Sequence, residues 1–349
     1  MRNKKIQFAN LVCRSGERTL LDLFDEIIHP AFFGEALHRS YGSTTYIFHG
    51  VKLINLSNSQ DGSGLAIVGR IVKDEYLRVE QILAEDGELE EVDETHRRSP
   101  SSIFVLFLNN HRMAYVKENA GAPSLHAFAA TLESFVKKIH KIIVSEHARN
   151  VRESFPKTEW VQKQKEFLNS FPLPTVDIVS LTDSRDIHDR IMGMGTVNNL
   201  SFDVIRQNDE INPENIFNSF RSEKIKLGNP AKASFKFGDQ ENSMNVPEVA
   251  VLVQQAAVDQ NVVYSVEGKV GEQTVKYSNA SRDDNDSEMM AVTVPLDNEN
   301  QTPLHVAHQS SNEFKRMIET GRINDPQMHD VQGRIVPALL GIIARFFVQ

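Results

Sequence analysis

Residues 102–108 read SIFVLFL, an apolar run broken only by its first residue. In an extended strand, neighbouring side chains point to opposite faces of the sheet, so this strand presents apolar side chains on both faces. The polar residues 109–111 predict a turn, and residues 113–116 predict the strand that returns beside it. The sequence therefore predicts a central strand whose sheet is covered on both sides.

The strongest helix signal runs from Ala122 to Ser145. Ser124 follows Pro123 and is suited to cap a helix. Apolar side chains then recur at helical spacing, at Leu125, Phe128, Ala129, Leu132, Phe135, Val136, Ile139, Ile142 and Ile143. Helical character resumes through Trp160 and Leu168. This pattern predicts a long amphipathic helix followed by a second one.

The segment FPLPT at residues 171–175 carries two prolines between that helical region and a new run of strands. Proline disfavours helix at the residue before it, and breaks of this kind are common at domain boundaries. We therefore expect two α+β domains, at residues 1–170 and 171–349, each with a mixed or antiparallel sheet and packed helices. The first would end in the long helix, and the second would contain the apolar segment near residue 340.

Local patterns predict the remaining elements. Alternating or apolar stretches predict strands at 6–12, 44–56, 65–72, 176–181, 200–205, 233–237, 262–270, 273–278 and 291–296, with a hairpin turn at Gly271–Glu272 and a strand bulge or turn at His49–Gly50. Helical spacing and caps predict helices at 19–29, 184–192, 212–227, 247–259 and 303–320. The acidic stretch that leads to Arg98 is expected to form an exposed hairpin or loop.

Composition limits the cellular setting. The 349 residues include one cysteine, Cys13, which excludes a disulfide framework and fits a reducing, cytoplasmic environment. The first residues carry positive charge but lack the apolar core of a signal peptide. The apolar run Ile335–Val348 is shorter than the roughly 20 residues of a membrane span. It is broken by Pro337, Gly341 and Arg345, so we expect a buried helix or a subunit contact and no membrane span.

Motifs for catalysis and cofactor binding are weak. Gly193-Met194-Gly195 lacks the third glycine of a dinucleotide-binding loop, because residue 198 is Asn198, and no phosphate-binding G-x-x-x-x-G-K motif occurs. The histidines show no zinc-ligand spacing. Glu267 and Lys269 have the E-x-K spelling of some metal-dependent nucleases, with an aspartate available among residues 177–189. We expect no catalytic residues, no metal and no cofactor, and keep a metal-dependent nuclease as an alternative.

The charge distribution points to phosphate binding. The formal net charge is −9, yet two segments are basic, Lys137–Lys165 and Arg221–Lys236. A phosphate backbone responds to the local field, so an acidic chain can still carry a basic face. The residues predicted to contact DNA are Lys137, Lys138, Lys141, Arg149, Arg152, Arg221, Lys224, Lys226, Lys232 and Lys236. Ordinary solvated helix faces would also produce such segments.

The order of several segments resembles a known family. Residues 102–136 give an apolar strand, a polar turn, a returning strand and an amphipathic helix, and they are followed by TVDIVSL, TDSRDIHDRI, NNLSFDVI, VYSVEGKVGEQTVKYSN and AVTVPL. This succession, over residues 44–296, resembles the RexA proteins of temperate lambdoid phages and, more loosely, proteins of bacterial anti-phage defence operons. The resemblance implies a dimeric, two-domain protein that binds double-stranded DNA without sequence preference and acts in phage exclusion with a partner protein.

Three functions remain open at this point. The first is a non-enzymatic DNA-binding component of phage defence or exclusion, the second is the metal-dependent nuclease, and the third is a protein-interaction module whose acidic loops serve as partner surfaces or DNA mimics. We also expect a homodimer through the apolar segment, using Ile335, Val336, Leu339, Leu340, Ile342, Ile343, Phe346 and Phe347.

Overall fold

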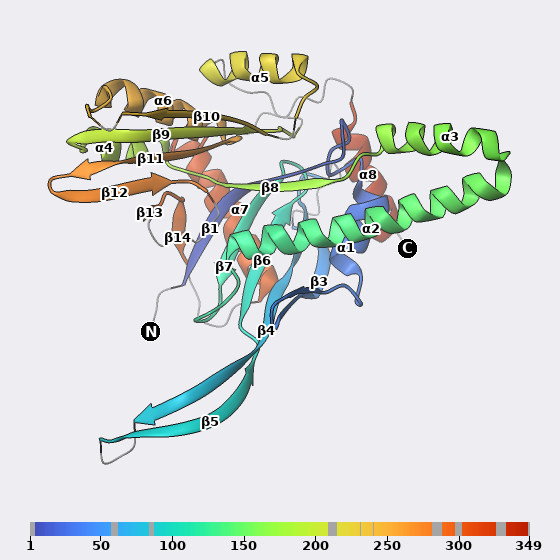
Figure 1. Cartoon of the computed structure of the whole chain (residues 1–349), viewed down its shortest axis with the longest axis horizontal. Helices are drawn as coiled ribbons and strands as arrows, with labels where there is room; N and C mark the ends of the chain where they lie inside the picture. The colour runs from blue at the N-terminus through green and yellow to red at the C-terminus, as the bar shows by residue number, and fades with distance from the viewer. Residues whose placement is uncertain are drawn as a thin grey trace.

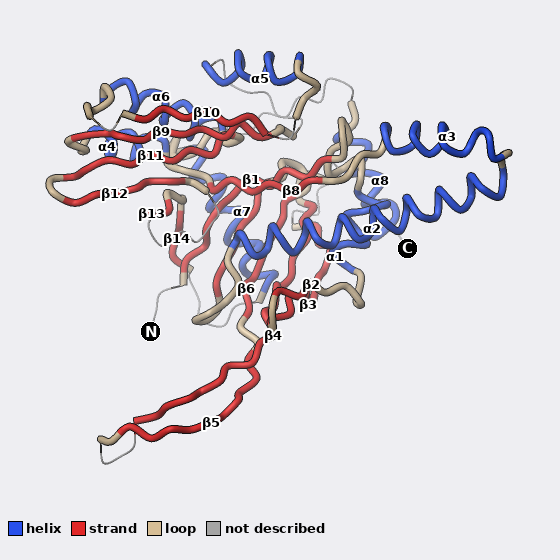
Figure 2. Tube along the Cα trace, viewed as in Figure 1, coloured by secondary structure: helices blue, strands red, loops and turns tan. Residues whose placement is uncertain are grey.

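The chain folds into two β-sheets with helices packed on them, and two slender hairpins extend away from this body (Figures 1 and 2). The computed structural model describes residues 4–56, 62–83, 87–208, 215–230, 232–239, 241–280, 288–296, 302–325 and 333–347. The expected α+β class is confirmed. The start of the helix expected at 212–227, and most of the polar stretch before residue 288, lie outside the described residues.

The larger sheet is antiparallel throughout its described strands. Its order is β14 (Thr293–Pro295), β1 (Lys5–Arg14), β7 (Arg112–Lys117), β6 (Ser101–Phe107), β4 (Leu65–Leu83), β3 (Thr44–Asn55) and β2 (Arg39–Tyr41), with β5 (Leu89–Arg98) paired to β4 and β8 (Thr175–Ser180) paired to β1. The register of β3 against β4 shifts between His49 and Lys52, which confirms the expected bulge.

Both faces of this sheet are covered, as the sequence of β6 predicts. Phe104 and Leu106 of β6 join the core beneath α2 (Leu125–Ser154) and α8 (Ile335–Phe346). Ile103 and Val105 point the other way, into the core shared with α7 (Pro303–Glu319). The side chain of Ser124 caps α2 by accepting a hydrogen bond from the amide of Ala127.

The smaller sheet has the order β10 (Lys232–Gly238), β9 (Thr196–Ile205), β11 (Val262–Val270), β12 (Gln273–Ser278) and β13 (Glu288–Met289). Three helices supply its core: α4 (Ser184–Met192), α5 (Ile216–Lys226) and α6 (Val246–Asp259). The hairpin expected at Gly271–Glu272 joins β11 to β12, and Gly271 has a φ of 59°, the left-handed region that glycine favours.

Three elements differ from their expected bounds. The helix expected from residue 19 is replaced by a π-helical turn, η1 (Phe24–Ile28), followed by the short α1 (His29–Phe33). Just before η1, the carboxylate of Asp22 accepts hydrogen bonds from the amide and the hydroxyl of Thr19. The helix α2 continues nine residues past its expected end at Ser145, and α3 (Lys157–Ser170) runs back beside it. The strand β4 continues to Leu83 and pairs with β5, so the acidic stretch forms the expected exposed hairpin.

The predicted boundary near residue 171 does not separate the two sheets. Immediately after the prolines, β8 pairs with β1 over Ala9–Arg14, so the larger sheet continues across this segment. Val176 and Ile178 of β8 lie in the same core as α2, and β14, α7 and α8 also return to the larger sheet. The prolines end the helix, but the side chains that follow them still pack against the preceding elements.

The apolar segment near residue 340 forms α8 and is anchored within its own chain. Ile335, Leu339 and Ile342 are buried in the core of the larger sheet, while Val336 and Leu340 remain exposed. Three of the eight side chains expected at a dimer contact are therefore packed within their own chain, and the homodimer stays a prediction. No helix in the described part of the chain is long and apolar enough to cross a membrane.

Buried polar side chains join the two sheets. The amide of Asn10 donates to Asn261 Oδ1 at 2.9 Å, and Asn208 donates to the carbonyl of Leu11 at 3.0 Å. Arg112 is almost fully buried and binds the side-chain oxygen of Gln260. Beside it, His111 is fully buried at a φ of 56°, and neither of its ring nitrogens has a hydrogen-bond partner within the described structure. These contacts hold β1 and the start of β7 against the segment that follows β9 and the residues just before β11.

His111 should make stability fall as the solution becomes mildly acidic. Burial, followed by the positive charges of Arg112 and Arg14, lowers the pKa of His111 to about 3, from about 6.5 in the unfolded chain. Between these two values the unfolded chain binds a proton that the folded chain does not, so stability decreases as the pH falls. We expect His111 to account for a loss of about 1 kcal/mol between pH 7 and pH 5.5. Urea unfolding at both pH values should show this loss in the wild type and a smaller one in His111→Asn, which tolerates positive φ. Equal losses in both proteins would contradict the assignment.

Candidate nucleic-acid interface

The cations predicted to contact DNA fall into two groups, one on α2 and one on α5 and β10. The α5 group includes two side chains that the structure buries. Arg221 donates from Nη1 to Asp259 Oδ2 at 2.8 Å, and its second terminal nitrogen binds the other carboxylate oxygen. Asn215 also donates to Asp259, at 2.9 Å. Arg221 therefore fastens α5 to the end of α6, and its prediction as a phosphate contact is wrong.

Lys224 is the second buried cation of this group. Its ammonium donates to the carbonyl of Val204 on β9 at 3.3 Å, and the residue is 4% exposed. Burial, with the nearby positive charges of Arg206 and Arg221, lowers the pKa of Lys224 to about 8, and Asp177 partly opposes this shift. Because this ammonium faces the protein interior, the prediction of Lys224 as an exposed DNA contact is also wrong.

The other three cations of the α5 and β10 group are exposed. Lys226 is paired with Glu223 at 2.6 Å, and Lys232 is paired with Asp203 at 2.6 Å. Lys236 is exposed on β10 and has no acidic partner among the described residues. Two of the three charges are therefore already compensated within the chain.

The α2 group contains more uncompensated charge. Lys137 is paired with Glu133 at 2.7 Å, and Lys138 donates to the carbonyl of His38. Lys141, Arg149 and Arg152 are exposed and have no acidic partner in the described structure. We call Lys138, Lys141, Arg149 and Arg152 the α2 cationic stripe. At a rise of 1.5 Å per residue it is about 21 Å long.

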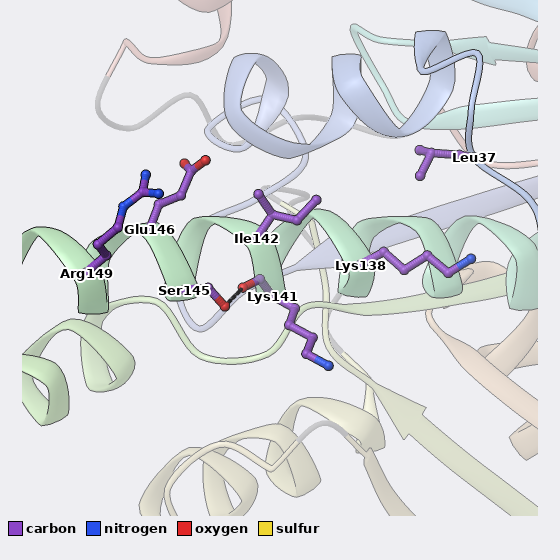
Figure 3. A pocket seen from close by; sticks show the side chains of 7 residues that line it. All are labelled: Leu37, Lys138, Lys141, Ile142, Ser145, Glu146 and Arg149. Carbon is purple, nitrogen blue, oxygen red and sulfur yellow. Dashed lines mark hydrogen bonds between the residues drawn. The ribbon is translucent and has the colours of Figure 1, made fainter.

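The stripe borders an open groove of about 530 Å³. The groove is lined by Leu37, Lys138, Lys141, Ile142, Ser145, Glu146 and Arg149. Figure 3 shows Ile142, Glu146 and Arg149 on the side of α2 that faces the loop carrying Leu37, whereas Lys141 extends toward the other side. The hydroxyl of Ser145 donates to the backbone carbonyl of Lys141 at 2.7 Å, a hydrogen bond that does not involve the ammonium of that lysine. The groove thus combines an apolar floor with a rim that carries three cations and the one carboxylate of Glu146.

The two basic groups approach each other around β8. Burial raises the pKa of Asp177 on this strand, and the negative charge of Glu133 on α2 acts in the same direction. The positive charges of Lys224 on α5 and Lys232 on β10 act in the opposite direction. These elements therefore converge on one edge of the larger sheet. The residues that meet there are buried or already ion-paired, so the uncompensated charge remains on the outer part of α2.

Sequence reasoning found the cations of α2 from their spacing but missed the apolar part of the groove. Leu37 lies about a hundred residues before the stripe, and no local pattern links it to α2. Ile142 was assigned to the apolar face of the helix, yet it is 55% exposed beside the stripe. The late turns of α2 extend past the body toward α3, where there is less core to cover them (Figure 1).

The residues of the nuclease alternative do not form a metal site. Glu267 lies on β11 in register with Lys276 of β12, as expected for ordinary cross-strand pairing. Within the described residues, no three His, Cys, Asp or Glu side chains gather in an arrangement that could hold a metal ion. The alternative therefore gains no support from the geometry.

No protein-family model matches this chain, and no curated protein sequence matches it. The resemblance to the RexA proteins consequently remains an expectation drawn from the order of segments.

Proposed function

We propose that this protein binds double-stranded DNA without reading its sequence, through the α2 cationic stripe. The observation that carries the proposal is the presence of Lys141, Arg149 and Arg152 along one exposed helix, without an acidic partner in the described structure. Lysine and arginine side chains in such a row can neutralise phosphates along a backbone. Phosphate contacts fix the position of a protein on a duplex but carry no sequence information, which fits the lack of a recognition motif.

The net charge of −9 does not exclude this binding. At physiological ionic strength the screening length is about 8 Å, so acidic residues on distant elements act only weakly at the stripe. The densest acidic element that the structure describes, the β4–β5 hairpin, extends away from α2 (Figure 1). The resemblance to the RexA proteins supports placing this activity in phage exclusion or defence, in a homodimer that acts with a second protein.

Reversing three charges of the stripe should abolish most of this binding. Each phosphate that a cation neutralises contributes a slope of about −0.9 in log K against log salt. Three such contacts correspond to an affinity change of about fortyfold between 50 and 200 mM salt. We expect Lys141→Glu, Arg149→Glu and Arg152→Glu together to lower affinity for a random duplex by at least this factor at 50 mM salt, as measured by fluorescence anisotropy.

A matched control separates the stripe from the total charge of the protein. Lys226→Glu, Lys236→Glu and Lys269→Glu together change the net charge by the same amount, at exposed positions on the smaller sheet and α5. This control should bind within about threefold of the wild type, a difference of less than 1 kcal/mol. Equal losses in both triple variants would show that binding depends on net charge, and a wild type that ignores DNA at 50 mM salt would refute the proposal.

A further inference from the structure

The distal part of the β4–β5 hairpin is a two-stranded ribbon with unusual side chains. We call residues 79–83 and 87–94 the acidic ribbon. It carries no Lys or Arg and six carboxylates, at Glu80, Glu88, Glu90, Glu91, Asp93 and Glu94. Arg78, Glu80 and Asp93 lie in one ion-paired group, whereas Glu90 and Glu91 have no cationic partner in the described structure. The ribbon therefore carries uncompensated negative charge.

Apolar side chains lie beside these carboxylates. Leu83 and Leu89 oppose each other across the two strands, and they are 70% and 63% exposed. Ile82 is opposite Glu90 and is also exposed. A lone two-stranded hairpin is only marginally stable in water, and exposed apolar groups of this kind typically mark contact surfaces.

The groove on α2 has the complementary set of groups. Leu37 and Ile142 form its apolar floor, and Arg149 and Glu146 stand on the same side of α2 (Figure 3). Lys138 and Lys141 also line the groove, and the Lys141 side chain extends toward the other side of the helix. The exposed leucines and carboxylates of the ribbon thus correspond to two apolar side chains in a groove whose lining holds three cations, Lys138, Lys141 and Arg149, and the one carboxylate of Glu146, so that the groove is positive overall. Opposite potentials favour both the encounter and the register of such a contact.

In one molecule the ribbon extends from the body well away from α2, which carries the groove (Figure 1), so the two do not meet within one chain. We infer that the acidic ribbon of one copy of this protein docks into the α2 groove of a second copy. The contact joins two different surfaces, so two copies can make it reciprocally in a closed dimer, or copies can be linked head to tail into a ring or an open chain.

The contact has a consequence that rests on the proposed function. The ribbon covers stripe cations that line the groove, Arg149 among them, so the ribbon contact and DNA binding compete for the same side chains. The ribbon then acts as a mimic of the phosphate backbone, and added duplex DNA should dissociate the assembly.

Charge exchange tests the contact directly by sedimentation velocity of the full-length protein at 50 mM salt. Glu90→Lys with Glu91→Lys makes the ribbon basic, and Lys141→Glu with Arg149→Glu makes the groove acidic. Each double variant replaces two attractions with two repulsions, so its dissociation constant for self-association should rise about tenfold. The quadruple variant carries the exchanged charges on both surfaces and should associate nearly as well as the wild type.

Two further proteins complete the experiment. Glu241→Lys with Glu272→Lys changes the same charge at exposed positions of the smaller-sheet region and should leave association unchanged. The ribbon variant should still bind DNA, because its cationic stripe is intact. A monomeric wild type, a quadruple variant no better than either double variant, or an equal loss in the control would overturn the inference. If the ribbon variant keeps both association and DNA binding, the inference fails while the proposed function stands.

Discussion

Replacing Asp259 with alanine should lower the free energy of unfolding by about 3–5 kcal/mol. The carboxylate is fully buried and accepts hydrogen bonds from Arg221 and Asn215, at 2.8 Å and 2.9 Å. Removing it leaves the guanidinium of Arg221 buried without a counter-charge, and such a charge is expensive to keep out of water. Urea unfolding followed by circular dichroism would measure the change.

The neighbouring pair on the same helix provides the control. Glu223 and Lys226 of α5 are both exposed, so Glu223→Ala should cost less than about 1 kcal/mol. Replacing both Arg221 and Asp259 with apolar residues of similar size should recover part of the stability that Asp259→Ala loses. If Asp259→Ala is no more damaging than Glu223→Ala, then Arg221 is not held as the structure describes.

Phe128→Ala should have a similar effect, about 3–5 kcal/mol, for a different reason. The ring of Phe128 is fully buried where α2 crosses the larger sheet. It lies 5.0 Å from the ring of Phe104 and 5.4 Å from that of Phe48, measured between centroids. Truncation leaves a cavity among aromatic side chains that cannot all move to fill it.

Phe237→Ala is the matched substitution, because this ring is 50% exposed on β10. It should change the unfolding free energy by less than about 1 kcal/mol. Thermal unfolding of both variants would compare the two positions directly. Nearly equal shifts would mean that α2 is not anchored through Phe128, and the position of the cationic stripe on the body would then be in doubt.

Local patterns predicted most elements because each had a signal within a few residues. The apolar run of β6 implied a sheet covered on both faces, and both cores are present. Ser124 and the apolar spacing behind it located the start of α2. The end of α2 was missed because its final turns lack a regular apolar face, and α3 supports them instead.

Long-range partnerships could not be predicted in the same way. Arg221 is buried because it binds Asp259, which lies 38 residues later at the end of α6. No residue close to Arg221 in the sequence indicates this pairing. The prolines at residues 172 and 174 indicate that the helix ends, but they do not indicate that β8 will pair with β1. The boundary prediction therefore failed at the level of tertiary pairing, although the elements on either side were correct.

In the candidate site, too, local features could be predicted from the sequence and long-range contacts could not. The spacing of Lys138, Lys141, Arg149 and Arg152 was visible in the sequence, since positions three and four apart lie on neighbouring parts of a helix surface. Which cations remained uncompensated was not visible, because that depends on contacts such as Lys232 with Asp203 on another strand. Most of the exposed cations without an acidic partner in the described structure lie on α2, so the DNA-binding prediction now rests on α2 and no longer on α5 and β10.

The salt dependence of binding to a random duplex tests the central claim most directly. Affinity should be measured between about 50 and 200 mM salt for the wild type and for the triple variant at Lys141, Arg149 and Arg152. If these three cations neutralise phosphates, the wild-type slope of log K against log salt should be steeper than the variant slope by about 2.7. Equal slopes in the two proteins, or no binding by the wild type at 50 mM salt, would contradict the assignment of the α2 cationic stripe as the DNA-binding surface.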